Sequence, residues 1–184
     1  MKTLFINTCL RPESRTEKLA KYYLQKYDTD YTEVKVQDLN LKPLTNTTLN
    51  QRNTTDHNDP LFDIPRQFKE AETIVVASPY YDLSFSALLK TYLENINIVG
   101  MTFEYDENDN PRTLSNVKKV VYLTTAGGPI ISHEYGYGYV KTMFNIFYEV
   151  NDFSYIYAEK LDLVGADVEK IMAEVYKKID KCFK

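Results

Sequence analysis

Short apolar runs alternate along the chain with longer segments whose apolar residues recur every three or four positions. In the first run, at residues 2–8, Leu4, Phe5 and Ile6 follow one another, which is typical of a strand buried on both faces. Further runs predict strands at residues 32–36, 73–78, 117–124 and 153–157. The pattern therefore predicts five strands separated by helical segments.

A helical pattern follows each of these strands. Ser14 and Glu17 have the spacing of a capping box, which predicts that the first helix begins there. Ser84 is expected to cap the third helix. The other helices are predicted at about residues 60–72, about residues 139–150 and from Val168 onward. Residues 40–59 are polar and lack a clear period, which predicts a long irregular connection.

This alternation predicts a parallel sheet with helices on both faces, because parallel strands need crossover connections. Five such strands fit the flavodoxin-like order 2-1-3-4-5, although periodicity alone does not set the order. Residues 100–113 are expected to form an inserted hairpin, since the turn residues at 106–111 follow a short β-like segment. We therefore predict an α/β three-layer sandwich formed by a single domain over residues 1–184.

Composition narrows the possible partners. The 184 residues carry a net charge of −4, which argues against nucleic acid and offers no basic cluster for a membrane surface. No apolar run approaches the length of a membrane span, and the chain does not start with the long apolar region of a signal peptide. The cysteines, Cys9 and Cys182, lie at opposite ends and build no disulfide framework, so we expect a cytoplasmic protein.

Three loops are expected to meet at the carboxyl edge of the sheet. In open α/β sheets, ligands bind beyond the carboxyl ends of the strands, near the point where the strand order reverses. The loops that leave the sheet there are residues 9–16, 79–85 and 124–129. We therefore take these loops as the candidate ligand site.

The first of these loops is suited to an anion. It carries Arg11, Ser14, Arg15 and Thr16 at a predicted helix start, where free backbone N–H groups and the helix dipole favour negative charge. Arginine adds bidentate contacts, so a phosphate monoester is the natural ligand, and a plain helix cap with solvated arginines is the alternative. The chain lacks the glycine-rich patterns of a Rossmann dinucleotide site and of a P-loop.

The other two loops are suited to a flat ring. Pro79 rigidifies the exit from its strand, and Tyr80 and Tyr81 follow it beside backbone amides. Gly127 and Gly128 allow a ligand to approach the backbone closely, although an ordinary turn also explains a glycine pair. Each signal is weak alone, and their joint placement at one edge of the sheet is what favours a ligand site.

On these residues the chain resembles the FMN-dependent NAD(P)H oxidoreductases of the flavodoxin-like fold, in particular the NADH-azoreductases and NAD(P)H-quinone reductases. The resemblance covers nearly the whole chain. It is most specific over residues 74–93, IVVASPYYDLSFSALLKTYL, which are similar to the family pattern of a strand, a proline, Met/Tyr-Tyr-Asn-Phe and a helix containing Leu-Lys. Other segments similar to the family pattern are residues 102–105, 125–128 and 158–159.

The resemblance implies FMN as cofactor, NADH or NADPH as electron donor, and two-electron ping-pong transfer to a quinone, azo or nitro compound. The cofactor-binding residues that it implies are Cys9, Arg11, Ser14, Arg15, Thr16, Pro79, Tyr80, Tyr81, Asp82, Leu83, Thr125, Ala126, Gly127 and Gly128. The first loop would hold the phosphate and the other two would border the flavin ring. This chemistry requires no side-chain acid or base, so we assign no catalytic residue.

The resemblance also implies a homodimer with the flavin at the subunit interface and a small aromatic electron acceptor. Tyr105 and Phe147 are then candidates for aromatic walls that the partner chain contributes to the substrate pocket. His133, which follows the third loop, is a further candidate for this pocket, although an ordinary exposed histidine is the simpler interpretation. The 16 tyrosines suit such an interface or pocket, and core packing is the alternative.

Three residues depart from the family pattern. Cys9 stands where serine is usual, Asp82 where asparagine is usual, and Ala126 where arginine is frequent. A carboxylate at position 82 beside the flavin would disfavour the anionic reduced form and lower its potential. Because of these departures, we retain the alternative that the chain is a member of the fold that has lost flavin and serves as a binding or regulatory protein. An electron-carrier flavodoxin is the other alternative, which the mild net charge does not favour.

We expect no metal site and no nucleophilic triad. His57 lies near Asp56 and Asp59 in the polar connection, which is too small a set of ligands to indicate a metal. The G-x-S-x-G pattern of a nucleophilic serine is absent from the sequence. Cys9 at a helix start is a conceivable redox nucleophile, but a role in the phosphate loop is favoured.

Overall fold

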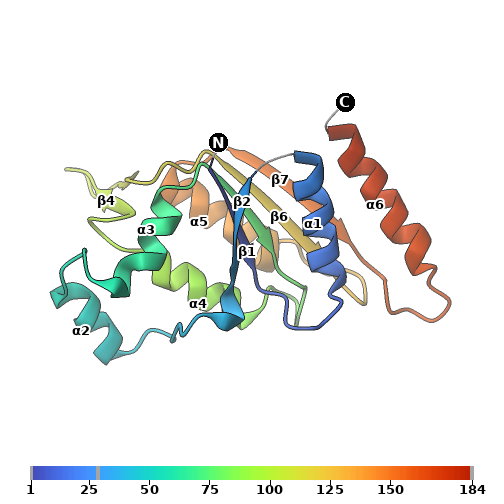
Figure 1. The fold of residues 1–184 in the computed structure, drawn as a ribbon, viewed down its shortest axis with the longest axis horizontal. Coiled ribbons are helices and arrows are strands. Elements are labelled where there is room, and N and C mark those ends of the chain that lie inside the picture. The colour runs from blue at the N-terminus through green and yellow to red at the C-terminus, as the bar shows by residue number, and fades with distance from the viewer. Residues whose placement is uncertain (1, 28–29, 183–184) are drawn as a thin grey trace.

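A five-stranded parallel sheet in the order β2-β1-β3-β6-β7 forms the centre of the computed structural model, which describes residues 2–27 and 30–182 (Figure 1). Its strands are β1 (Thr3–Asn7), β2 (Tyr31–Lys35), β3 (Thr73–Ala77), β6 (Lys119–Thr125) and β7 (Asp152–Ala158). The inserted strands β4 (Phe103–Tyr105) and β5 (Pro111–Thr113) form an antiparallel hairpin. Without these two hairpin strands in the count, the sheet has the order 2-1-3-4-5, so the predicted fold is confirmed.

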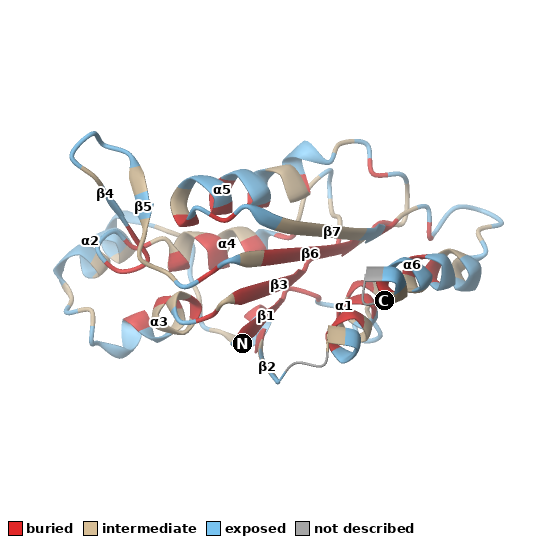
Figure 2. Cartoon of the chain, turned by 90° about the horizontal axis from the view of Figure 1, so that it is seen from above, coloured by how far each residue is buried: buried red, intermediate tan, exposed pale blue. Residues whose placement is uncertain are grey.

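Helices cover both faces of the sheet (Figures 1 and 2). One face carries α1 (Arg15–Tyr27) and α6 (Val168–Cys182), and the other carries α3 (Asp63–Lys69), α4 (Ala87–Ile96) and α5 (Tyr139–Tyr148). Successive side chains of each strand point to opposite faces, so the sheet separates two cores. Leu4 and Ile6 share a core with Leu93 of α4, whereas Phe5 shares the other with Leu19 of α1.

The polar connection contains a helix that periodicity did not predict. No residue of α2 (Asn46–Thr54) is buried, so this helix lacks the apolar stripe by which a packed helix is recognised. Its start is stabilised by a capping box, in which the side chains of Thr45 and Thr48 each accept a bond from the other's backbone N–H. Arg52 then anchors the helix by donating to backbone oxygens at the C-terminal end of α4.

Two other helix starts differ from the prediction. The N-cap of α4 is Ser86 rather than Ser84, because the Ser86 hydroxyl accepts the Leu89 N–H while Ser84 closes a turn in the preceding loop. The helix predicted at residues 60–72 is divided into a 3-10 turn, η2 (Pro60–Phe62), and α3. Short helical turns also follow β2, as η1 (Val36–Asp38), and precede α5, as the π-helical turn η3 (Glu134–Gly138). Across residues 2–27 and 30–182, no helix has the length and apolar character needed to cross a membrane.

Candidate functional site

The three predicted loops come together at the carboxyl edge of the sheet. They line a polar pocket of about 390 Å³ beyond the ends of β1, β3 and β6. In the sheet, β2 pairs with one side of β1 and β3 pairs with the other side. The pocket therefore lies where the strand order reverses. The predicted cofactor-binding residues that line it are Arg11, Ser14, Arg15, Thr16, Pro79, Tyr80, Tyr81, Thr125, Ala126 and Gly127.

Hydrogen bonds hold these loops to one another. The hydroxyl oxygens of Thr16 and Thr125 lie 2.7 Å apart and join the first loop to the third. The backbone N–H of Tyr80 donates to the Thr125 oxygen at 3.1 Å and joins the second loop to the third. The three loops are therefore joined to one another mainly by backbone and hydroxyl contacts.

The start of α1 faces this pocket. The Ser14 hydroxyl accepts the Glu17 N–H at 3.4 Å, as the predicted capping box requires. In place of the second capping-box bond, which would run from the Ser14 N–H to the Glu17 side chain, the Glu17 carboxylate accepts a hydrogen bond from Lys21 at 2.5 Å, one turn further along the helix. The first backbone N–H groups of the helix and Arg15 thus make an anion-binding end in which the charge of Glu17 is paired.

Cys9 is buried in the core and does not line the pocket. Its side chain is buried, and its backbone N–H donates to the Asn7 side chain at 3.0 Å. Burial raises the pKa of the Cys9 thiol from its ordinary 9.0 to about 11. The thiol therefore stays protonated at neutral pH, which argues against its use as a redox nucleophile.

The second loop contains a strained two-residue turn. Tyr81 and Ser84 exchange backbone hydrogen bonds of 2.8 Å in both directions, and between them Asp82 and Leu83 adopt φ angles of 47° and 70°. This left-handed pair is the geometry of a type I′ turn, which ordinarily selects Asn or Gly. Asp82 and Leu83 point out of the pocket lining and are exposed, so the Asp82 carboxylate lies in solvent.

A fourth loop, which the amino-acid pattern did not indicate, completes the pocket. Backbone N–H groups of residues 160, 161 and 162 donate to the oxygens of Gly128, Ala126 and Gly127, at 2.9, 3.2 and 2.8 Å. This pairing brings Leu161 and Asp162 into the pocket lining, whereas Gly128 is not part of it. The adjacency of β7 and β6 was the available signal, because the loop after β7 must leave the same edge of the sheet.

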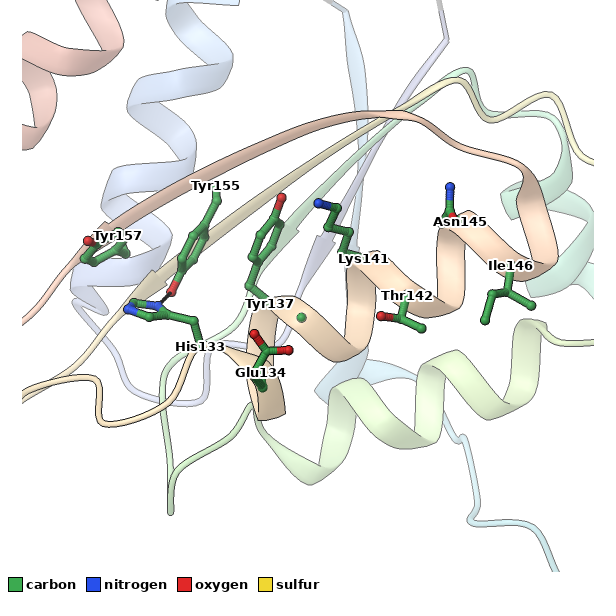
Figure 3. Close-up of a pocket in the computed structure, with 10 residues that line it drawn as sticks. His133, Glu134, Tyr137, Lys141, Thr142, Asn145, Ile146, Tyr155 and Tyr157 are labelled. Atoms are coloured by element: carbon green, nitrogen blue, oxygen red, sulfur yellow. Dashed lines mark hydrogen bonds between the residues drawn. The ribbon is translucent and has the colours of Figure 1, made fainter.

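A larger aromatic groove, of about 700 Å³, lies between α5 and the edge strand β7 (Figure 3). His133 lies at one end of this groove, with its Nδ1 2.9 Å from the Tyr155 hydroxyl. The rings of Tyr137 and Tyr155 stack almost in parallel, with centroids 4.3 Å apart, and burial raises the pKa of Tyr155. The groove lies at the edge strand β7 and not at the switch point between β1 and β3, so we regard the smaller polar pocket as the candidate cofactor site.

Tyr105 and Phe147 lie at the other end of the sheet. Phe147 packs against Phe103 of the hairpin with ring centroids 4.8 Å apart, and Tyr105 is half exposed on the same hairpin. Figure 2 shows this hairpin at the opposite end from the loop between β7 and α6. Neither residue lines the polar pocket of its own chain, so their contribution through a partner chain stays a prediction.

The described residues contain no group of three or more His, Cys, Asp or Glu side chains arranged to hold a metal ion. His57 instead packs edge-on against Phe62, with ring centroids 4.9 Å apart. His57 therefore acts in the structure as a packing residue.

The open parallel sheet with a polar pocket at its switch point is the arrangement of the doubly wound α/β proteins, in which ligands bind beyond the carboxyl ends of the strands. Residues 1–182 match the family model described as the flavodoxin-like fold, and the chain belongs to this family.

The chain is also similar to curated enzymes of nearly the same length. It is 32% identical over 185 residues to the FMN-dependent NADH:quinone oxidoreductase of Coprothermobacter proteolyticus, with 94% of this chain and 92% of the relative covered. It is 34% identical over 194 residues to the FMN-dependent NADH:quinone oxidoreductase 2 of Clostridium acetobutylicum, with coverage of 96% and 95%.

Solved structures agree on the fold. An azoreductase from Bacillus anthracis superposes with a TM-score of 0.84 at 22% identity, covering 99% of this chain and 98% of that one. The FMN-dependent NADH-azoreductase from the Ames Ancestor strain of the same species, solved in complex with FMN, gives 0.81 at 23% identity, with 100% and 98% covered. At this level of identity the superpositions establish the fold.

Proposed function

We propose that this protein is an FMN-dependent NAD(P)H oxidoreductase, with NADH as the donor, that reduces quinones or azo compounds by two-electron transfer. The observation that carries the proposal is the meeting of three strand-end loops around one pocket with a helix start and two arginines. The similarity to NADH:quinone oxidoreductases over almost the whole chain supports the same function.

The residues of the pocket fit FMN. Arg11, Arg15 and the hydroxyl of Ser14 surround the start of α1, where a phosphate would gain both hydrogen bonds and the helix dipole. Tyr80 and Tyr81 would border the flavin ring, and a volume of about 390 Å³ lies within the range of cofactor sites.

Bound FMN would supply the hydride and electron-transfer chemistry. The chain's own part is to hold the phosphate and the ring edges while leaving one open side for a flat donor or acceptor. The exposed position of Asp82 keeps its carboxylate away from the pocket lining, so the departure from asparagine does not prevent cofactor binding.

The test is a titration of the purified protein with FMN, followed by visible absorbance and by quenching of flavin fluorescence. We expect saturable FMN binding, and then rapid oxidation of NADH when a quinone or an azo dye is present. NADPH should be assayed in parallel to measure donor preference. FMN binding without NADH oxidation would favour an electron-carrier flavodoxin, and an absence of FMN binding would favour a binding or regulatory protein.

We infer that the working form is a homodimer. Exposed aromatic and apolar side chains, including Tyr135, Tyr139 and Ile146, lie along η3 and the outer face of α5. They border two grooves, of about 700 and 500 Å³, which share Glu134 and Thr142 and so form one continuous surface. A second copy on this surface would cover it, and the far position of Tyr105 and Phe147 is compatible with their reaching the flavin of another chain.

Sedimentation of the FMN-loaded protein tests the dimer. Ile146→Glu should shift the protein from dimer to monomer, because it buries a charge in the proposed interface. Val164→Glu is the matched control, since Val164 is exposed on the loop between β7 and α6 and should leave the dimer intact. A monomeric native protein would contradict the inference. We further propose that the chain acts as a single domain in the cytoplasm.

A further inference from the structure

One ion pair crosses the polar pocket. The Arg15 Nη1 atom donates to the Asp162 Oδ1 atom at 2.7 Å, and both residues line the pocket. Arg15 is the first residue of α1, so this carboxylate stands at the anion-binding start of the helix. The pair is partly exposed, with 42% and 60% of the two side chains accessible to solvent, and therefore contributes little to stability.

Asp162 is held in this place by the backbone. Its N–H donates to the Gly127 oxygen at 2.8 Å, and the neighbouring residues 160 and 161 make parallel contacts with Gly128 and Ala126. Its carboxylate fills the space above Gly127, where an added Cβ atom would clash with the Asp162 Oδ2 atom. The room that the glycine leaves at this edge of the pocket is thus taken by an anionic side chain of the protein itself.

The other acidic residues near the helix start are paired elsewhere. Glu13 forms an ion pair with Lys18, and Glu17 forms one with Lys21, so both carboxylates are neutralised by lysines of α1. Asp162 differs because its partner is an arginine of the pocket lining. A phosphate monoester, which carries about −1.5 to −2 charges at neutral pH, would meet this carboxylate and would need the same arginine.

We propose that Asp162 competes with the FMN phosphate for Arg15 and so lowers the preference of the pocket for FMN over riboflavin. This inference rests on the proposed function, since it assigns a residue that sets specificity within the proposed cofactor site. The carboxylate acts in two ways: it holds the guanidinium group in an existing ion pair, and it repels the incoming phosphate. Both effects concern the phosphate alone and do not involve the flavin ring.

The experiment compares the dissociation constants of FMN and riboflavin, measured by flavin fluorescence, for the native protein and for Asp162→Asn. The variant should bind FMN roughly two- to fivefold more tightly, since exposed charge pairs contribute modest energies, and should bind riboflavin unchanged. The gain should shrink at 1 M salt, where the screening length falls to about 3 Å.

Asp167→Asn is the matched control, because Asp167 is an exposed aspartate of the same loop whose side chain caps the Lys170 N–H. Asparagine caps helices as well as aspartate, so both flavin affinities should be unchanged. Thermal unfolding of each variant would show that the fold is kept.

Equal or weaker FMN binding by Asp162→Asn would overturn the inference, and weaker binding would mean that Asp162 positions Arg15 for the phosphate. If neither FMN nor riboflavin binds to any of the proteins, the proposed function itself fails.

Discussion

The two ends of the sheet are held together by different forces. At the carboxyl end, backbone hydrogen bonds and the Thr16–Thr125 hydroxyl pair tie the loops, and the side chains remain partly exposed. At the amino end, the hairpin and the end of α5 meet through packed rings, such as Phe103 on Phe147. Because loops tied by their backbones need no apolar filling, a polar pocket survives at the carboxyl end, whereas packing closes the amino end.

Backbone strain is also distributed unequally between the two ends. Four non-glycine residues with left-handed φ angles belong to the carboxyl-end loops, namely Glu13, Asp82, Leu83 and Lys160, against two at the amino end, Asp109 and Glu149. Such conformations persist where the surrounding contacts impose them, and they gather at functional sites. The comparison indicates that the carboxyl end is built for binding at some cost in stability, and that the amino end supplies stability.

The largest effect that tests this division is expected from Arg52→Ala at the amino end. Arg52 is half-buried and donates to two backbone oxygens at the end of α4, one of them Glu94 at 3.0 Å. Its loss should lower the free energy of unfolding by about 2–3 kcal/mol, because bonds from charged donors are strong and their acceptors would be left without this partner. Denaturant unfolding measures the loss, and the FMN dissociation constant should not change.

Arg11→Ala is the matched variant at the carboxyl end. Arg11 is exposed and lines the pocket, so its removal should weaken FMN binding and change stability by no more than about 0.5 kcal/mol. If Arg52→Ala weakens FMN binding as much as Arg11→Ala does, the two ends are coupled and the division is wrong.

A comparable effect, confined to alkaline pH, is expected from Cys9. Its thiol pKa is about 11 in the folded protein against 9.0 in the unfolded chain, so the unfolded chain loses the proton first as the pH rises. The free energy of unfolding should therefore fall by about 2–3 kcal/mol more in the native protein than in Cys9→Ser between pH 9 and pH 11. Urea unfolding at several pH values measures the difference, and an equal pH dependence in the two proteins would contradict it.

A smaller effect is expected from Leu83→Gly in the strained turn. A left-handed conformation costs a residue with a Cβ atom roughly 1–2 kcal/mol, and glycine removes this strain. Glycine also loses more chain entropy on folding than leucine does, which offsets part of the stabilisation. The variant should therefore be more stable by about 0.5–1 kcal/mol in thermal or denaturant unfolding.

Leu163→Gly serves as its control, because Leu163 is equally exposed, at 49%, and has no left-handed φ angle. This substitution should be neutral or destabilising. A loss of stability in both variants would show that the turn stores no strain.

The smallest effect is expected from Asp82→Asn. Asp82 lies outside the pocket lining, on the turn that follows Tyr81. Removal of its negative charge should still favour the anionic reduced form through space, so the midpoint potential of bound FMN should rise. Because Asp82 is exposed, the change should be about 1 kcal/mol or less, which is roughly 20 mV for a two-electron couple. Spectroelectrochemical titration measures it, and an unchanged potential would place Asp82 outside the electronic surroundings of the ring.

Much of the fold was predictable because its three central strands, β1, β3 and β6, are buried on both faces. Continuous apolar runs such as Leu4 to Ile6 are strong signals, and the alternation of strands with helices leaves few topologies. The helix α2 was not predictable in this way, since it buries no side chain and depends on a threonine capping box. The cap of α4 was wrongly predicted at Ser84, because only the structure shows that Ser84 closes a turn with Tyr81 and that Ser86 accepts the Leu89 N–H.

The order of the elements and the three loops that follow β1, β3 and β6 were predictable from the amino-acid pattern, because burial pattern and turn chemistry are local properties. The place of the loop after β7 in the pocket, and of Asp162 above Gly127, became visible in the folded chain alone. Those contacts join residues about 35 positions apart, and their geometry follows from the pairing of β6 with β7, which no local pattern encodes.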